Sequence, residues 1–275
     1  MTLSIRNIVR CKCVCKSWRD LIKEDDEFAT SCTPKPCLAF VHENEGFNIC
    51  NEACEPHFQF DLPPPYSQYP THEHHRRVVI DSTSGLLLVW DGVRIDCSAL
   101  FICNPMTLEF VELPPLPTSR CIFGFGVSNL NRKFKILCCE LSGSCHVYTL
   151  GGEGAWRSID APPSRLRLSV LVSRDTAAFL NGNLHWLAIG ENYLFICCFN
   201  LETELFSCFS LPHGEDSGSN DGKLQLRVLE DRLCLCSNLF SDNRIVIWRM
   251  NDYGNDKAWV EFLSSPKMIE RLRVC

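Results

Sequence analysis

The stretch Phe179-Leu180-Asn181-Gly182-Asn183-Leu184-His185-Trp186 predicts two short strands joined by a tight turn. Asn-Gly between apolar runs is a strong signal for a two-residue hairpin, because both residue types tolerate positive φ. Two further apolar runs, Tyr193–Phe199 and Phe206–Leu211, follow in the same segment. The segment therefore predicts one antiparallel sheet of about four short strands.

The same pattern recurs along the chain. Apolar runs begin at residues 38, 86, 136, 184 and 233, and a period of about 50 residues is typical of kelch-type blades. One small sheet cannot cover both of its faces, whereas sheets repeated around an axis can cover one another. We therefore expect a mainly β fold, a kelch-like β-propeller with about five four-stranded repeats between residues 36 and 266. A β-sandwich would explain the strands without explaining the period, and the sequence leaves open whether the ring closes.

Two segments share the residue types of one turn. In Asn104–Phe110 and Asn200–Phe206, Asn, Thr and Phe stand at the same offsets. Asn favours a turn because its side chain can bond the nearby backbone, and the aromatic residue then resumes a strand. We expect both segments to connect the third and fourth strands of their repeats. Several of the fourth strands end in Leu-Pro, because proline cannot donate to the next ladder hydrogen bond.

Composition and charge exclude several classes of protein. The chain has 275 residues, 45% of them hydrophobic, and its net charge is −6. These values predict a folded protein with no general attraction to nucleic acid. The N-terminus lacks the apolar stretch of a signal peptide, and no apolar run is long enough to span a membrane. We therefore expect no membrane association and a cytoplasmic or nuclear location, or both.

The 19 cysteines do not predict a metal site. No Cys-x-x-Cys pair occurs, and the adjacent pairs Cys138-Cys139 and Cys197-Cys198 lie in strand-like runs, where neighbours point to opposite faces. In a reducing compartment we expect most of these thiols to act as small buried hydrophobic side chains. His72-Glu73-His74-His75 lies in a proline-rich segment, which favours a solvated loop over a dedicated metal site.

The sequence also lacks the motifs of common enzymes. It has no Gly-x-Ser-x-Gly elbow of a hydrolase. Gly151-Gly152-Glu153-Gly154 is not followed by the Lys-Ser/Thr of a phosphate-binding loop. We therefore expect neither catalysis nor a bound cofactor.

Residues 1–30 differ from the repeats. Val14, Trp18, Leu21 and Ile22 fall at i, i+4, i+7 and i+8, which places them on one face of a helix. Periodicity leaves two interpretations open, because packing on the β domain and docking into a partner's groove need the same spacing. We expect a short helical segment over residues 1–30, followed by the β domain.

The helical segment resembles the C-terminal half of a plant F-box, with Cys13-Val14-Cys15-Lys16-Ser17-Trp18-Arg19 as the matching core. The rest of the chain resembles the F-box-associated interaction region. That resemblance is carried by Asn104-Pro105, Gly124-Phe125-Gly126, Phe179–Trp186 and the Leu-Pro strand ends. Nothing before Arg10 matches the Leu-Pro-containing helix that begins an F-box, and the chain stops at Cys275. The resemblance thus implies an F-box shortened at its start and a propeller region shortened at its end.

This resemblance implies a substrate-receptor subunit of a Skp–cullin–F-box ubiquitin ligase. The helical segment would bind the Skp adaptor, and through it cullin, while propeller loops would bind an unknown target protein. The longest loops are Pro63–Arg77 and His213–Lys223. The alternative is an interaction scaffold outside any ligase, or a decayed F-box fragment that cannot bind the adaptor. The residues implied in adaptor binding are Val14, Cys15, Lys16, Trp18, Arg19, Leu21 and Ile22.

Overall fold

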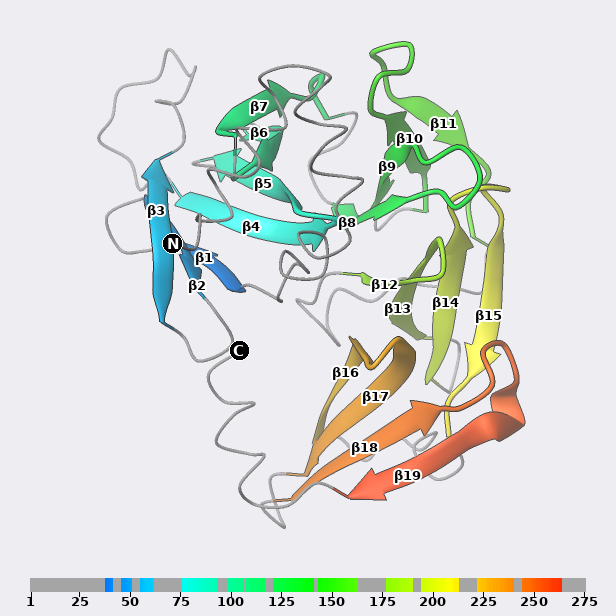
Figure 1. Cartoon of the computed structure of the whole chain (residues 1–275). Helices are drawn as coiled ribbons and strands as arrows, with labels where there is room; N and C mark the ends of the chain where they lie inside the picture. The colour runs from blue at the N-terminus through cyan, green and yellow to red at the C-terminus, as the bar shows by residue number, and fades with distance from the viewer. Residues whose placement is uncertain are drawn as a thin grey trace, which may run out of the picture. The chain divides into compact units, whose positions relative to one another are not determined.

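The computed structural model consists of short antiparallel strands (Figure 1). It describes residues 38–41, 46–50, 55–61, 76–92, 98–105, 107–116, 121–140, 143–162, 177–189, 194–212, 222–239 and 244–263. The strands are β1 Leu38–Val41, β2 Gly46–Cys50, β3 Pro56–Asp61, β4 Arg76–Thr83, β5 Leu86–Gly92, β6 Ser98–Asn104, β7 Glu109–Glu112, β8 Cys121–Val127, β9 Phe134–Glu140, β10 Cys145–Thr149, β11 Arg157–Ile159, β12 Ala178–Leu180, β13 Asn183–Ile189, β14 Leu194–Asn200, β15 Phe206–Ser210, β16 Gly222–Leu229, β17 Arg232–Leu239, β18 Arg244–Met250 and β19 Trp259–Leu263. A 3₁₀ turn, Asp256–Ala258, precedes β19.

The sheets confirm the expected repeats. Four sheets have four strands each, in chain order: β4–β7, β8–β11, β12–β15 and β16–β19. The apolar run that marks each of these repeats is its second strand, β5, β9, β13 or β17. The first repeat differs from the expectation, because the residues described there form a three-stranded sheet, β1–β3. Its marker run is β1, so its described part begins with the equivalent of a second strand.

The chain divides into two compact units. The first unit, Met1–Val79 with Gly85–Glu112, holds the sheet β1–β3 and most of β4–β7. The second unit, Ile80–Ser84 with Leu113–Cys275, holds the end of β4 and the other three sheets. The second unit carries the site described below.

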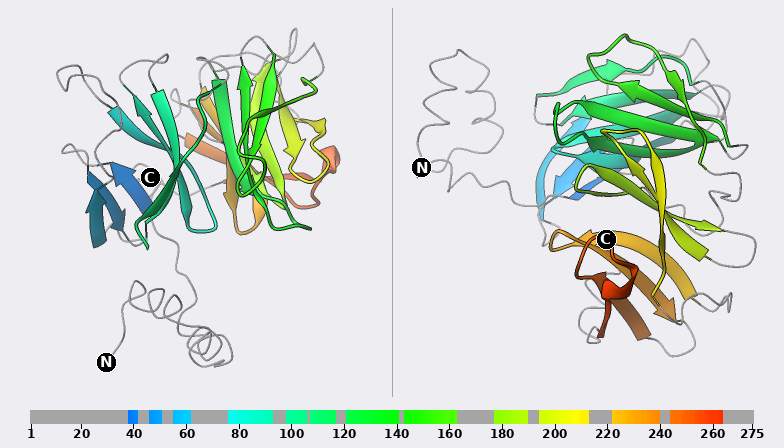
Figure 2. Two further views of the ribbon diagram at one scale, coloured as in Figure 1. Left: turned by 90° about the horizontal axis from the view of Figure 1, so that it is seen from above. Right: turned by 90° about the vertical axis from the view of Figure 1, so that its right-hand side faces the viewer.

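Within the second unit, the sheet β12–β15 lies between β8–β11 and β16–β19 (Figures 1 and 2). Trp186 of β13 packs in a buried cluster with Leu137 of β9, on one face of the middle sheet. Its neighbour Leu187 packs in a second cluster with Leu233 of β17, on the other face. Because both faces are covered, the central strands are nearly continuous apolar runs. Each such side chain contributes about 1.5–3 kcal/mol when fully buried.

The predicted hairpin at Asn181-Gly182 is confirmed. The two residues have φ of 52° and 73°, the paired positive values of a type I′ turn. Ser84-Gly85 between β4 and β5, and Glu230-Asp231 between β16 and β17, also have positive φ at both residues. Three repeats thus join their first and second strands by the same turn, although only one has the Asn-Gly signature.

The two matched Asn turns also form as expected, between β6 and β7 and between β14 and β15. The backbone carbonyl of Asn104 accepts from Leu108 N at 2.9 Å, and that of Asn200 accepts from Glu204 N at 2.8 Å. Asn200 Oδ1 accepts from Thr203 N at 2.8 Å. The side chain of Asn therefore fixes the turn, as its local hydrogen bonding predicts.

Gly124 and Gly126 of β8 allow this strand to approach the middle sheet closely. A Cβ at Gly124 would lie 2.6 Å from Cζ2 of Trp186, and one at Gly126 would lie 2.6 Å from Cδ1 of Leu201. Real Cβ atoms do not make such short contacts. The motif Gly124-Phe125-Gly126 is thus explained by packing between sheets.

Polar contacts link the sheets of the second unit. His185 of β13 is fully buried; its Nδ1–H donates to Ala178 O at 2.8 Å, and its Nε2 accepts from Tyr253 O–H at 2.7 Å. Lys135 of β9 donates to Leu201 O at 2.6 Å and pairs with Glu204 at 2.9 Å. These bonds satisfy buried polar groups and fix neighbouring sheets in one register.

The cysteines among the described residues largely follow the expectation for buried thiols. Cys197 packs in the cluster with Trp186, while Cys198 lies on the opposite face, 3.8 Å from Tyr253 Oη. One pair departs from the expectation of free thiols, because Cys139 of β9 and Cys145 of β10 are joined by a disulfide. The two residues stand directly opposite each other in the antiparallel register, which local sequence spacing does not reveal.

Candidate functional site

The residues predicted to bind an adaptor, Val14, Cys15, Lys16, Trp18, Arg19, Leu21 and Ile22, lie outside the described residues. So do residues 63–75 and 213–221, which make up most of the two long loops proposed for target binding. The structure therefore does not test whether these residues form a binding surface. The site that it does describe lies elsewhere.

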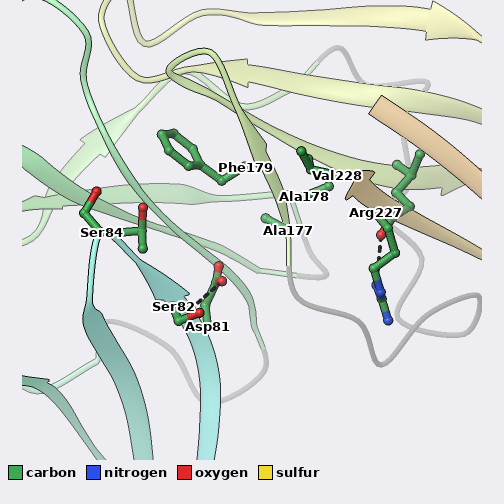
Figure 3. Close-up of a pocket in the computed structure, with 10 residues that line it drawn as sticks. Asp81, Ser82, Ser84, Ala177, Ala178, Phe179, Arg227 and Val228 are labelled. Atoms are coloured by element: carbon green, nitrogen blue, oxygen red, sulfur yellow. Dashed lines mark hydrogen bonds between the residues drawn. The ribbon is translucent and has the colours of Figure 1, made fainter. Parts of the chain in front are cut away.

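A cavity of about 480 Å³ opens between three strand segments of the second unit (Figure 3). Its walls come from the end of β4, from β12 with the residue before it, and from the end of β16. The volume is within the range of about 300–1,000 Å³ that is usual for small-ligand sites. The ten lining residues are Asp81, Ser82, Thr83, Ser84, Ala177, Ala178, Phe179, Leu226, Arg227 and Val228.

The repeat explains why these residues meet. Asp81, Ala178 and Arg227 each stand three residues before a two-residue turn, so they occupy equivalent positions in three repeats. The three turns close hairpins of the same geometry, and the strands that precede them therefore present equivalent positions to one cavity. Sequence reasoning missed this site. One signal was available in the sequence: the position three residues before the turn holds a charged residue in two repeats, Asp81 and Arg227, but the apolar Ala178 in the repeat between them.

Asp81 is the buried charged group of the cavity. Its side chain is 9% exposed. Ser82 N donates to its Oδ1 at 2.7 Å, and Phe125 N donates to its Oδ2 at 3.0 Å. Burial raises the pKa of Asp81 to about 7, although the hydrogen bonds from Phe125 and Ser82 oppose the shift. No charged side chain contributes to this shift, so the carboxylate is held by backbone dipoles rather than by a cation.

Arg227 supplies the opposite charge from another strand. Its Nη1 donates to Leu226 O at 2.8 Å and its Nη2 donates to Gln225 Oε1 at 3.4 Å, and both acceptors belong to its own strand. Figure 3 shows Asp81 and Arg227 on different strands, with Ala177 between them in the view. The cavity therefore carries two separated charges of opposite sign.

The rest of the lining is small or apolar. Ser82 and Ser84 are exposed, and their hydroxyls can donate or accept a hydrogen bond. Phe179 and Val228 are half-buried and give the cavity an apolar side. An apolar wall with a few placed polar groups is the composition of a binding site.

The described residues offer no arrangement for holding a metal ion, and burial makes two of the described thiols poorly reactive. No three His, Cys, Asp or Glu side chains gather there in a way that could hold a metal ion. Burial raises the pKa of Cys103 and of Cys236 to about 11, which keeps these thiols protonated and unreactive at neutral pH.

Comparison with known proteins identifies the family. The chain matches the F-box associated beta propeller domain over residues 47–275 and the F-box domain over residues 1–30. The chain belongs to the F-box-associated β-propeller family. The four four-stranded sheets are therefore propeller blades, and the resemblance seen in the sequence is confirmed. The F-box match begins at residue 1, ahead of the segment from Arg10 that carried the resemblance.

Its relatives include plant F-box proteins that match over most of the chain. F-box protein At3g07870 of Arabidopsis thaliana is 25% identical, over 94% of this chain and 68% of its own length. F-box protein At2g23160 of Arabidopsis thaliana is 26% identical, over 90% of this chain and 91% of its own length. F-box protein DOR of Arabidopsis thaliana is 24% identical, over 96% of this chain and 74% of its own length.

The described part of the chain contains no helix with the length and apolar character needed to cross a membrane.

Proposed function

We propose that this protein is the substrate receptor of a Skp–cullin–F-box ubiquitin ligase. The observation that carries the proposal is the presence, in one chain, of an F-box match and an F-box-associated propeller match. A receptor of this kind needs two binding surfaces, one for the adaptor and one for the target. The transfer of ubiquitin belongs to other subunits, so this chain contributes proximity and orientation rather than chemistry. The proposal implies a cytoplasmic or nuclear location.

Adaptor binding is assigned to the F-box segment. Trp18 is the expected anchor, because buried aromatic residues contribute most to typical interfaces. Val14, Leu21 and Ile22 extend the same face by helical spacing, and Cys15 continues the segment. Lys16 and Arg19 would lie at the rim, where charges mainly steer association.

Target binding is assigned to the propeller. Blades provide a rigid scaffold, and binding residues are often carried by the loops and strand ends of such scaffolds. The cavity that includes Asp81 and Arg227 is the described feature that fits this role best. Its small apolar side and separated charges suit one side chain of a partner protein.

The test is a binding assay between the purified full chain and a plant Skp-family adaptor. We expect a stable complex that also recruits cullin, and we expect Trp18→Ala to weaken adaptor binding at least about tenfold. The matched control is Leu205→Ala, which truncates a side chain that is 63% exposed on the propeller. The control should bind like the wild type. Circular dichroism of each variant checks that the β domain is still folded.

Two outcomes would count against the proposal. A folded wild-type chain that does not bind the adaptor cannot join the ligase, which leaves an interaction scaffold as the remaining function. Equal binding by the wild type and Trp18→Ala would move the adaptor contact away from the F-box segment.

A further inference from the structure

The cavity contains a charge that the described fold does not neutralise with another charge. Asp81 is 9% exposed, and two backbone N–H groups donate to its carboxylate. Each carboxylate oxygen has a second lone pair, so Asp81 retains acceptor capacity toward the cavity. Burial without a cation is costly for a carboxylate. A cationic guest beside Asp81 would offset that cost.

We propose that the cavity binds a lysine or arginine side chain of a target protein, with its charged end beside the Asp81 carboxylate. This inference rests on the proposed receptor function, because it names the class of residue that the receptor would recognise. The apolar stem of the guest side chain packs against Phe179 and Val228, as long basic side chains pack their methylene groups on apolar surfaces.

Arg227 completes the recognition from another strand, β16. Its guanidinium repels a second cation, so the basic end of the guest is directed toward Asp81. Its N–H groups can also donate to a backbone carbonyl of the bound segment, which carries no charge and accepts two hydrogen bonds. Ser82 and Ser84 provide further polar contacts at the exposed part of the wall. The cavity thus orients a peptide as well as binding one charge.

Binding is expected to depend on pH through Asp81. The carboxyl must be ionised to pair with a cation, and burial places its pKa at about 7. The other charged group that lines the cavity is Arg227 of β16, while β12 lines it with Ala178 and Phe179 and β8 contributes the N–H of Phe125. His185, which bonds Ala178 O, has its pKa lowered to about 4 by burial and stays neutral.

The experiment measures binding of two matched peptides to the purified full chain by isothermal titration calorimetry or NMR. The probe is acetyl-Gly-Arg-Gly-amide, and its neutral isostere has citrulline in place of arginine. We expect the arginine peptide to bind at least about tenfold more tightly than the citrulline peptide, since the pair to Asp81 is largely desolvated. We also expect its affinity at pH 6 to be about a tenth of that at pH 8, because the ionised fraction of Asp81 falls by that factor.

Three variants locate the binding. Asp81→Asn removes the charge and should abolish both the preference for arginine and the pH dependence. Val228→Phe adds bulk to the apolar wall and retains the Asp81 carboxyl group; it should also prevent binding, which keeps the test decisive if Asp81→Asn does not fold. Asp160→Asn removes an exposed carboxylate outside the cavity and should bind like the wild type.

The inference is overturned if the wild type binds neither peptide at millimolar concentration or binds both equally well. Arginine-peptide binding that survives in folded Asp81→Asn or Val228→Phe would also overturn it. The adaptor assay separates this inference from the proposed function. A chain that binds the adaptor but not the arginine peptide is a receptor with another target site. A chain that binds the arginine peptide but not the adaptor would support the cavity assignment and contradict the ligase role.

Discussion

Gly124→Ala tests the packing of β8 against the middle blade. The new Cβ would lie 2.6 Å from Cζ2 of Trp186 and 2.8 Å from Cδ1 of Leu184, where ordinary contacts begin at 3.4 Å. Neither neighbour has free space to move into, because Leu184 is fully buried and Trp186 is 5% exposed. The indole Nε1–H of Trp186 also donates to Phe123 O at 3.3 Å, which holds the ring in place.

The expected cost follows from this overlap. Adding a methyl group to a well-packed core typically costs about 1–3 kcal/mol, and we expect Gly124→Ala to lower the free energy of unfolding by that amount. Trp186→Phe removes the outer ring that carries Cζ2 but leaves the overlap with Leu184, so Gly124→Ala should cost about 1 kcal/mol less in that background than in the wild type. This difference in cost between the two backgrounds is the coupling energy of positions 124 and 186, and it is specific to their contact.

The measurement is urea denaturation of the four proteins of this cycle, followed by circular dichroism and tryptophan fluorescence. The control is Gly254→Ala, where φ is +86° and no atom lies within 4 Å of the added Cβ. That variant carries only the strain of a left-handed residue, about 1 kcal/mol, and should cost the same with and without Trp186→Phe. An equal cost of Gly124→Ala in both backgrounds would refute the packing explanation.

Three further predictions concern buried charges. Because the pKa of Asp81 is raised from 3.8 to about 7, the folded state binds more protons, and the contribution of Asp81 to the free energy of unfolding falls by up to about 4 kcal/mol as pH rises through that window; the difference between the wild type and Asp81→Asn in urea titrations should show this fall. The pKa of His185 is lowered from 6.5 to about 4, so its contribution rises with pH over that overlapping interval by up to about 3 kcal/mol and offsets most of the Asp81 fall in the wild type; His185→Asn should therefore steepen the fall of the unfolding free energy with pH, and an unchanged pH slope would contradict the assignment. Glu204→Gln should cost about 1–3 kcal/mol, because Lys135 is left buried without its counter-charge; Lys135→Met together with Glu204→Gln should recover part of that loss in the same assay.

The repeat architecture could be predicted from the sequence because its signals are local. Alternation of side chains along a strand, turn residues and a fixed period act within about 50 residues of chain. Asn181-Gly182 predicted its hairpin, and the match between Asn104–Phe110 and Asn200–Phe206 predicted two equivalent turns. The first repeat was the exception, since its described part has three strands where four were expected.

The cavity could not be predicted in the same way. Asp81 and Arg227 are far apart in the sequence, and each looks like an isolated charge near a turn. They line one cavity because three repeats place equivalent strand positions side by side. Aligning the repeats on their turns would have shown the charged positions, but not the burial that raises the pKa of Asp81.

The sequence by itself determined the class of this protein: the F-box-like core Cys13–Arg19, the repeated strands and the turns that join them. These features depend on short-range geometry and on residue types, and both can be read directly from the sequence. The tertiary structure decided which distant side chains meet. It paired His185 with Tyr253 and required glycine at position 124, because these contacts depend on how closely whole sheets approach, and that distance is set by the packing of many side chains together. It also joined Cys139 to Cys145 within one sheet, through the register of β9 against β10.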